Sequence, residues 1–227
     1  MASSSELPSS SPSKEYYDMS NQKLCFVLSN TKYLSKKDEE LIEKTWIDMD
    51  YLVHIYRELK QEEILRKLEE FATSSEKISI VTMFVLTHDV RKDCVYVGGE
   101  LCKITKIFEA LNALESVPKI MYIQNNRRYI NVLENMITEA LTALTTTSVK
   151  TAIIFNDTVC DEHYKCDLKL PEASQDIFIM HSDEVADEDV REHGSPMINE
   201  LCKQIKPNLD FDEYIQRVRE AVANYPF

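Results

Sequence analysis

The sequence predicts an α/β fold, with a mostly parallel central sheet covered by helices on both faces. Apolar runs of strand length alternate with segments whose apolar residues recur every three or four positions, as in amphipathic helices. The first run, 24–28 (LCFVL), is apolar throughout, which is typical of a strand buried on both faces. At 227 residues and 44% hydrophobic content, the chain can bury one sizeable core. Such alternation favours parallel strands joined by helical crossovers.

The first part of the chain contains the clearest alternation. Ser29 and Asn30 end the first apolar run with turn-forming side chains. Leu41, Ile42 and Trp46 then share one face of a predicted helix. The expected elements are strands at 24–28, 51–56 and 78–86, and helices at 38–49 and 61–71.

The second part is less regular. The Gly98-Gly99 pair within 95–101 indicates a small hairpin, because glycine adopts the positive φ values that tight hairpin turns need. A helix is expected at 104–114 and a short apolar strand at 120–123. Between 129 and 168, four apolar residues would line a helix and the segment 151–155 (TAIIF) has strand character. Those four residues are Val132, Met136, Leu141 and Leu144.

Charge and cysteine usage limit the classes of protein that this chain fits. The net charge of −13 disfavours nucleic acid and anionic membrane as partners. No apolar run approaches the ~20 residues that cross a bilayer, and residues 1–15 are rich in Ser and Pro, so we expect them to be disordered. The six cysteines are scattered, and several lie in apolar segments, which indicates reduced, mostly buried thiols. We therefore expect a cytoplasmic protein.

The most informative segment is 117–128, VPKIMYIQNNRR. A short apolar strand runs into Gln124, Asn125, Asn126 and two arginines, and this layout resembles the strand end where caspases carry Gln-Ala-Cys-Arg-Gly. Asn126 stands where that family has its nucleophilic cysteine. Because an amide cannot form the thiolate that attacks a peptide carbonyl, the resemblance implies a caspase-like protein that does not cleave peptides.

Other segments resemble caspases in the same order along the chain. The segment 78–89 (ISIVTMFVLTHD) is similar to the strand that delivers the general-base histidine, which places that position at His88. The segment 169–182 (KLPEASQDIFIMHS) is similar to the first strand of the small subunit. The segments 194–202 (GSPMINELC) and 209–223 are similar to its two helices.

The resemblance covers about residues 16 to 223 and implies the caspase–haemoglobinase fold. It divides the chain into a large-subunit-like region at 16–128, a linker-like region at 129–168 and a small-subunit-like region at 169–227. In caspases the linker is cut at aspartates. Here the aspartates of that region are either cleavage positions or solvated loop residues.

Several features beyond the missing thiol oppose catalysis. Asp89 follows His88 where caspases have a glycine whose N–H helps to line the oxyanion hole, and a carboxylate there works against a forming negative charge. His88 and Asn126 are 38 positions apart, which is shorter than the roughly 50 typical of the signature. We therefore interpret His88 and Asn126 as vestigial positions and predict no catalytic residue.

The aspartate-binding pocket of caspases uses two arginines and a glutamine. Gln124 matches the glutamine. The first arginine is replaced within the segment 34–38 (LSKKD), Asp189 stands at the offset of the second, and Pro196 replaces the tryptophan after Gly-Ser. Gln124 is thus the one predicted remnant of substrate binding.

A metal site and a different nucleophile are the alternatives for the linker-like region. Cys160, His163 and Cys166 offer soft ligands, but structural zinc sites use four ligands with tighter pairing, so we predict no metal and no cofactor. A divergent cysteine peptidase would use Cys160 or Cys166, which lie in the most loosely placed part of the chain.

Caspases continue past their last helix into a strand that pairs across the dimer axis, whereas this sequence stops at Phe227, directly after that helix. Either the homodimer is absent, or another segment such as 151–155 takes the place of the strand. The function that the resemblance implies is a pseudo-caspase or decoy that binds a paralogous active caspase, as in a heterodimer, and modulates it in apoptosis. The alternatives are the divergent peptidase and a scaffold without a caspase partner.

Overall fold

The computed structural model describes residues 18–30, 36–74, 76–88, 90–91, 93–114, 116–127, 153–156, 177–185, 193–206 and 210–223. The segment 1–15 and the expected helix after residue 129 lie outside these residues, as do Cys160, His163 and Cys166. None of the described helices is long and apolar enough to cross a membrane.

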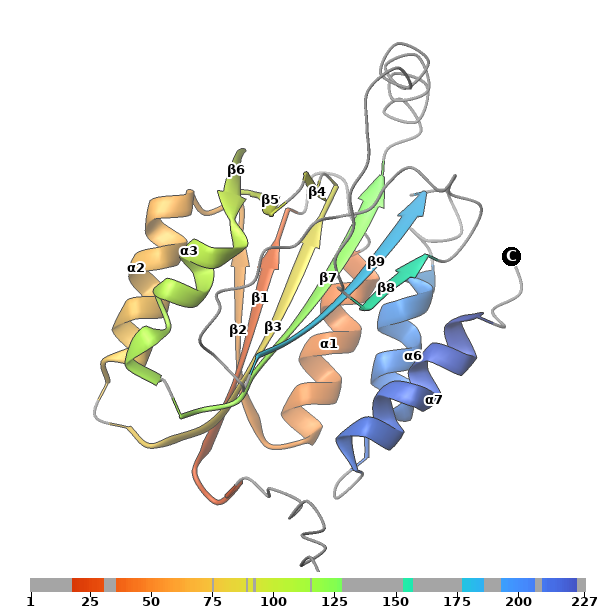
Figure 1. Cartoon of the computed structure of the whole chain (residues 1–227), viewed down its shortest axis with the longest axis horizontal. Coiled ribbons are helices and arrows are strands. Elements are labelled where there is room, and N and C mark those ends of the chain that lie inside the picture. Colours follow the sequence, from red (N-terminus) through yellow and green to blue (C-terminus); the bar gives the residue numbers. More distant parts are fainter. Residues whose placement is uncertain are drawn as a thin grey trace, which may run out of the picture.

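A six-stranded parallel sheet forms the centre of the molecule, in the order β2-β1-β3-β7-β9-β8 (Figure 1). The predicted α/β class and parallel sheet are confirmed. The strands are β1 (Gln22–Ser29), β2 (Tyr51–Arg57), β3 (Ile78–Thr87), β7 (Lys119–Arg127), β8 (Ile153–Asn156) and β9 (Ile177–Val185).

Helices cover the two faces of the sheet (Figure 1). On one face lie α2 (Gln61–Ala72), α3 (Ile104–Glu109) and the 3₁₀ turn η1 (Asn112–Leu114). On the other lie α1 (Lys36–Asp48), α6 (Pro196–Gln204) and α7 (Phe211–Ala223). Right-handed crossovers between parallel strands are the connections that place helices on both faces in this way.

Alternate residues of each strand divide between two hydrophobic cores. In β1, Phe26 lies in the core beneath α2 and α3, whereas Cys25 and Val27 lie in the core beneath α1, α6 and α7. Trp46 of α1 meets Phe84 of β3 edge-on in the second core, with ring centroids 4.7 Å apart. Burial on both faces explains why the central strands are apolar throughout.

The predicted hairpin at Gly98-Gly99 is confirmed as part of a small second sheet. It consists of β4 (Val90–Arg91), β5 (Cys94–Val97) and β6 (Glu100–Lys103), all antiparallel. Gly98 has φ +59°, and a Cβ at this position would lie 1.9 Å from the carbonyl oxygen of Leu59. Glycine is therefore required both for the turn and for the close approach of the backbone.

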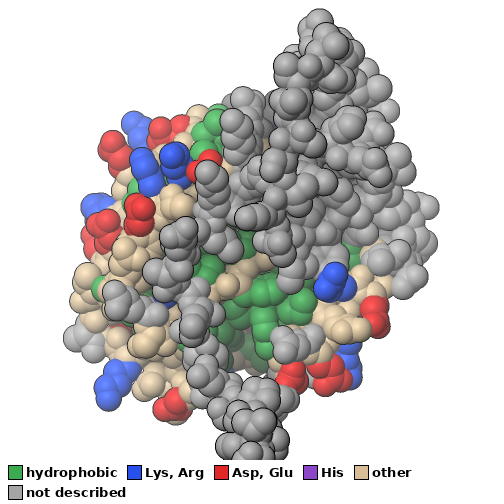
Figure 2. Space-filling view, viewed as in Figure 1, with side chains coloured by type: hydrophobic (Ala, Val, Ile, Leu, Met, Phe, Trp, Pro, Cys, Tyr) green, Lys and Arg blue, Asp and Glu red, His purple; other side chains and the backbone are tan. Residues whose placement is uncertain are grey.

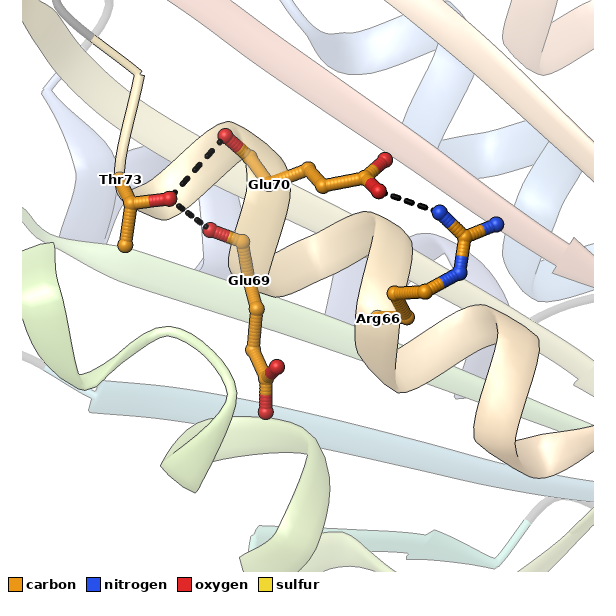
Figure 3. Close-up of polar contacts among 4 residues, drawn as sticks. All are labelled: Arg66, Glu69, Glu70 and Thr73. Atoms are coloured by element: carbon orange, nitrogen blue, oxygen red, sulfur yellow. Dashed lines mark hydrogen bonds and ion pairs between the residues drawn. The ribbon is translucent and has the colours of Figure 1, made fainter.

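The end of α2 shows how a surface helix of this chain is stabilised (Figure 3). The Thr73 hydroxyl donates to the carbonyl oxygen of Glu69 at 2.7 Å, and Arg66 pairs with Glu70 one turn away. The same carbonyl also accepts the Thr73 backbone N–H at 2.9 Å, so both bonds hold Thr73 against the last turn of α2. Ion pairs at this spacing add only a few tenths of a kcal/mol, so packing on the sheet holds the helix in place.

Two elements differ from the sequence-based predictions. The predicted helix at 104–114 ends at Glu109 and continues as η1. The predicted strand at 120–123 extends through Asn126 to Arg127, because its polar end stays paired with β9. The strand character predicted for 151–155 is confirmed by β8, which pairs in parallel with residues Met180–Asp183 of β9 and takes the outer place of the sheet.

Candidate vestigial catalytic site

The predicted site residues lie where β3, β7 and β9 end side by side. Thr87 is in register with Asn125, and Asn125 with Asp183, so the polar end of β7 runs between its two neighbours. The carboxyl ends of parallel strands are the usual place for binding and catalytic groups in open α/β sheets. The position of the site is therefore the one that its fold favours.

The Asn126 side chain is buried, with 1% of its surface exposed, and hydrogen bonds engage both ends of its amide. Gln124 Nε2 donates to Asn126 Oδ1 at 2.7 Å, and Asn126 Nδ2 donates to Ser195 Oγ at 3.2 Å. Both partners are also buried. The residue at the nucleophile position thus acts as a two-sided link between the end of β7 and the start of α6.

Ser195 passes this link on to a buried carboxylate, Asp38. The Ser195 backbone N–H donates to Asp38 Oδ1 at 2.7 Å, and its hydroxyl donates to Asp38 Oδ2 at 2.6 Å. Ser195 is the residue before α6, yet its hydroxyl does not cap that helix. Asp38 lies in the first turn of α1, where a negative charge also complements the helix dipole. We call Gln124, Asn126, Ser195 and Asp38 the buried polar chain.

Gly194 makes room for the buried polar chain. Its φ is +88°, and a Cβ would lie 2.8 Å from Asp38 Oδ1. A side chain at this position would therefore push the carboxylate away from Ser195. The Gly-Ser pair that begins the small-subunit-like helix has a packing role in this chain.

Burial raises the pKa of Asp38 from its ordinary value of 3.8 to about 6. The cause is the loss of water around the carboxylate, and hydrogen bonds from Ser195 and Asn126 offset part of that cost. The nearby charge of Glu39 raises the pKa further. Glu39 itself pairs with Arg57 at the end of β2, at 2.7 Å. The first turn of α1 thus brings buried acidic side chains next to the site.

His88 follows β3 and is only partly buried. Its Nδ1 lies 3.3 Å from the Asn30 side-chain nitrogen, and its ring contacts that of Tyr96 with centroids 4.6 Å apart. Tyr96 belongs to β5, whose buried residues join the core under α2 and α3. The contacts of Asn126 instead lead to α6 and α1 on the opposite face. His88 and Asn126 are therefore held by contacts with different layers of the molecule.

The chemistry open to this arrangement is limited. A caspase needs a thiolate, a histidine to handle its proton and donors for the oxyanion. Within the buried polar chain, Ser195 carries the hydroxyl that could replace a thiol as nucleophile. This hydroxyl is fully buried, so a peptide carbonyl cannot reach it. Among the described residues, no group of three His, Cys, Asp or Glu side chains is placed to hold a metal ion.

The sequence did not identify Asp38 and Ser195 as partners. They are 157 positions apart, and each has a local explanation, as a residue in an acidic helix start and as the residue before a helix beginning with proline. Asp89, Leu34 and Asp189, on which other arguments depended, lie outside the described residues.

Comparisons with known proteins agree with this fold. The caspase domain family, Peptidase_C14, matches residues 22–226. A caspase-like protein of Trichoplusia ni ascovirus 2c is 34% identical over 215 residues, which cover 90% of this chain and 93% of that protein. Caspase-14 of Homo sapiens is 29% identical over 130 residues, or 49% of this chain and 50% of that protein.

A solved structure, described as pro-sf-caspase-1, covers all of this chain and 88% of its own with a TM-score of 0.63. At 17% sequence identity that likeness concerns the fold alone. The family match extends over nearly the whole chain, and it includes both the strand end with Asn126 and the helix start with Ser195. This chain belongs to the caspase family.

Proposed function

We propose that this chain is a non-catalytic caspase homologue that binds an active caspase and modulates it. The observation that carries the proposal is the double engagement of the Asn126 amide inside the buried polar chain. A nucleophile must be reachable by its substrate and able to ionise. The residue at this position has neither property.

Recognition of an aspartyl substrate is also opposed. Gln124 is fully buried, and its Nε2 donates to Asn126, so this donor is already used within the protein. Asp38 lies at the other end of the same buried polar chain, and its carboxylate would repel that of a substrate when both are charged. The buried polar chain thus links Gln124 to a carboxylate, and it contains no arginine that could bind an aspartyl side chain in a bidentate manner.

The four cysteines in the described residues do not favour a peptidase with a different nucleophile. Cys25, Cys94, Cys102 and Cys202 are free thiols, and burial raises the pKa of each. A raised pKa lowers the fraction of reactive thiolate. Labelling with a thiol-directed active-site probe tests this alternative, including Cys160 and Cys166.

A surface suited to a caspase partner lies beside β9. Among the described residues, strand β8 pairs with β9 only from Met180 to Asp183, so Ile177, Phe178 and Ile179 have no strand partner there on that side. Ile177 and Phe178 are partly exposed there, although they pack against the two different cores. Figure 2 shows hydrophobic side chains gathered between the place of β9 in Figure 1 and that of α7.

Phe211 enlarges this apolar area from the start of α7. Its side chain is 36% exposed, and its ring meets that of Phe178 edge-on at 5.0 Å between centroids. A partner chain that pairs with the free part of β9 and covers Phe211 would remove apolar surface from water and satisfy backbone groups. A stable complex of this kind buries about 1,200–2,000 Å² in total.

The deciding experiment is co-purification with a paralogous active caspase and measurement of its activity with and without this chain. Phe211→Glu should weaken the complex at least about tenfold, because a charge in an apolar contact has no partner. Leu101→Glu is the matched control, since Leu101 is 41% exposed but lies on β6. Ile179 and Val222 are unsuitable because both are buried, and their substitution would unfold the domain.

A folded chain that neither binds the caspase nor changes its activity would contradict the proposal and favour a scaffold role. Cleavage of an aspartyl peptide by the purified chain would contradict the other part of the proposal, the lack of catalysis. Mutation of His88 or Gln124 should leave binding unchanged, since neither lies on the β9 surface.

A further inference from the structure

We propose that the Ser195 hydroxyl is a proton-controlled switch, which donates to Asp38 while that carboxylate is charged and to Asn126 Oδ1 once Asp38 has taken up a proton. The switch lies inside the buried polar chain, and it joins the first turn of α1, the start of α6 and the end of β7. It gives this fold a response to mild acid that does not depend on the caspase partner proposed above.

The contacts of Ser195 Oγ permit both arrangements. This oxygen lies 2.6 Å from Asp38 Oδ2, and it lies 3.2 Å from Nδ2 and 3.4 Å from Oδ1 of Asn126. A hydroxyl has one proton to donate and two lone pairs that accept. Rotation about the Cβ–Oγ bond is therefore enough to change the acceptor of this proton, without movement of the backbone.

The geometry of the carboxyl group decides which of its oxygens takes the proton. Asp38 Oδ1 accepts the Ser195 backbone N–H at 2.7 Å, and that donor is present whatever the charge of Asp38. Oδ2 faces the Ser195 hydroxyl at 2.6 Å, and only one proton can lie between two oxygens in so short a contact. A carboxylic acid is a stronger donor than an aliphatic hydroxyl. Protonated Oδ2 therefore donates to Oγ, and the hydroxyl proton turns towards Asn126.

Asn126 Oδ1 can accept this second donor. It already accepts from Gln124 Nε2 at 2.7 Å, and an amide oxygen has two lone pairs. Its distance of 3.4 Å from Ser195 Oγ should shorten towards the usual ~2.7–2.8 Å once the hydroxyl donates to it. Both residues are buried, so bulk water does not compete for the proton. Proton uptake should therefore tighten the contact between the start of α6 and the end of β7.

The groups around Asp38 place the switch in mild acid. Burial and, to a smaller extent, the charge of Glu39 raise the pKa of Asp38 to about 6. Among the elements packed against α1, β2 brings Arg57, which pairs with Glu39, and α6 brings Cys202. Burial raises the pKa of Cys202 to about 12, so this thiol stays neutral in mild acid. Among the described side chains, β1 and β7 bring no charged group against Asp38.

NMR of the full chain, with the side-chain carbonyl carbons of Asp and Asn labelled, tests the proposal in a titration from about pH 4.5 to 8. The Cγ signal of Asp38 should titrate with a midpoint at about 6. The Cγ signal of Asn126 should follow with the same midpoint and move downfield in acid, because its oxygen then accepts a second hydrogen bond. Fluorescence of the single tryptophan, Trp46, shows whether the chain stays folded over this range.

Variants of the chain separate the switch from a direct effect of charge. In Asp38→Asn, the new amide nitrogen donates to Ser195 Oγ as the protonated acid would, so the Asn126 signal should keep its acid position at every pH. In Ser195→Ala, Asp38 should still titrate, whereas Asn126 should no longer follow. Glu39→Gln should lower both midpoints together. Asp48→Asn, at an exposed position of the same helix, is the matched control and should change neither titration.

An Asn126 signal that stays constant while Asp38 titrates would overturn the proposal. An Asn126 titration that persists in Ser195→Ala would also overturn it, because the charge of Asp38 would then act on the amide without the hydroxyl. A constant Asp38 signal would show that this carboxylate takes up no proton in mild acid, which would overturn the proposal as well.

Discussion

The ends of β7 and β3 carry the two positions that act together in caspases, and these positions differ in burial and in contacts. Asn126 at the end of β7 is buried and linked through Ser195 to Asp38 on another helix. His88 after β3 is partly exposed and rests on Tyr96. The residue at the first position thus belongs to a hydrogen-bonded chain that joins β7 to the starts of α6 and α1, whereas the residue at the second lies near the surface.

The largest expected effect comes from removing the carboxylate that ends the buried polar chain. Asp38→Ala should lower the free energy of unfolding by about 3 kcal/mol, because the Ser195 N–H and hydroxyl lose their acceptors while they stay buried. Urea denaturation measures the change. Asp48→Ala, at an exposed position of the same helix, is the control and should stay within about 0.5 kcal/mol of the unchanged chain.

Protonation of the same carboxylate should have a smaller effect. Because the pKa of Asp38 is raised to about 6 in the folded chain, the folded state binds more protons than the unfolded state between pH 4 and 6. The free energy of unfolding should therefore fall as pH rises through this window, by about 2 kcal/mol for this group. Comparison with Asp38→Asn isolates the group among other titrations. Identical pH slopes in the two proteins would contradict the assignment.

Restoring the family residue at the end of β7 should cost stability and restore no activity. Asn126→Cys removes the acceptor for Gln124 Nε2 and the donor to Ser195 Oγ, which should destabilise the chain by about 1–3 kcal/mol. Cleavage of a fluorogenic aspartyl peptide should stay at background. Strong cleavage by this variant would show that the buried polar chain opens readily around a thiol. The end of β7 would then be accessible to substrate, as the end of β3 is.

The smallest effect is expected at the end of β3. His88→Ala removes contacts with Asn30 and Tyr96 at a partly exposed position, and it should cost about 1 kcal/mol or less. Thermal unfolding of His88→Ala and Asn126→Cys, measured under the same conditions, compares the loss of stability at the two positions directly. A larger loss at His88 than at Asn126 would reverse the contrast drawn above.

Much of the fold follows from local patterns in the sequence. The strand at 24–28 and the hairpin at Gly98-Gly99 are found where they were expected, as β1 and as β5 with β6. A strand buried on both faces appears as a continuous apolar run, and a two-residue hairpin turn needs residues that adopt positive φ. Each pattern is contained in a few consecutive residues, so it can be recognised without knowledge of the tertiary structure. The extension of β7 through Asn126 was missed because its last residues are polar, and such a pattern favours a turn until partners are known.

The sequence by itself determined the α/β class, the family and the absence of a thiol at position 126, because each depends on residue type and order along the chain. Only the tertiary structure decided that Asn126 is buried against Ser195, that Asp38 ends the same buried polar chain, and that β8 takes the outer place beside β9. The physical reason is distance along the chain. Hydrogen bonds between residues up to 157 positions apart form only after the sheet and its helices have brought their ends together, and a strand acquires its neighbour in the same way.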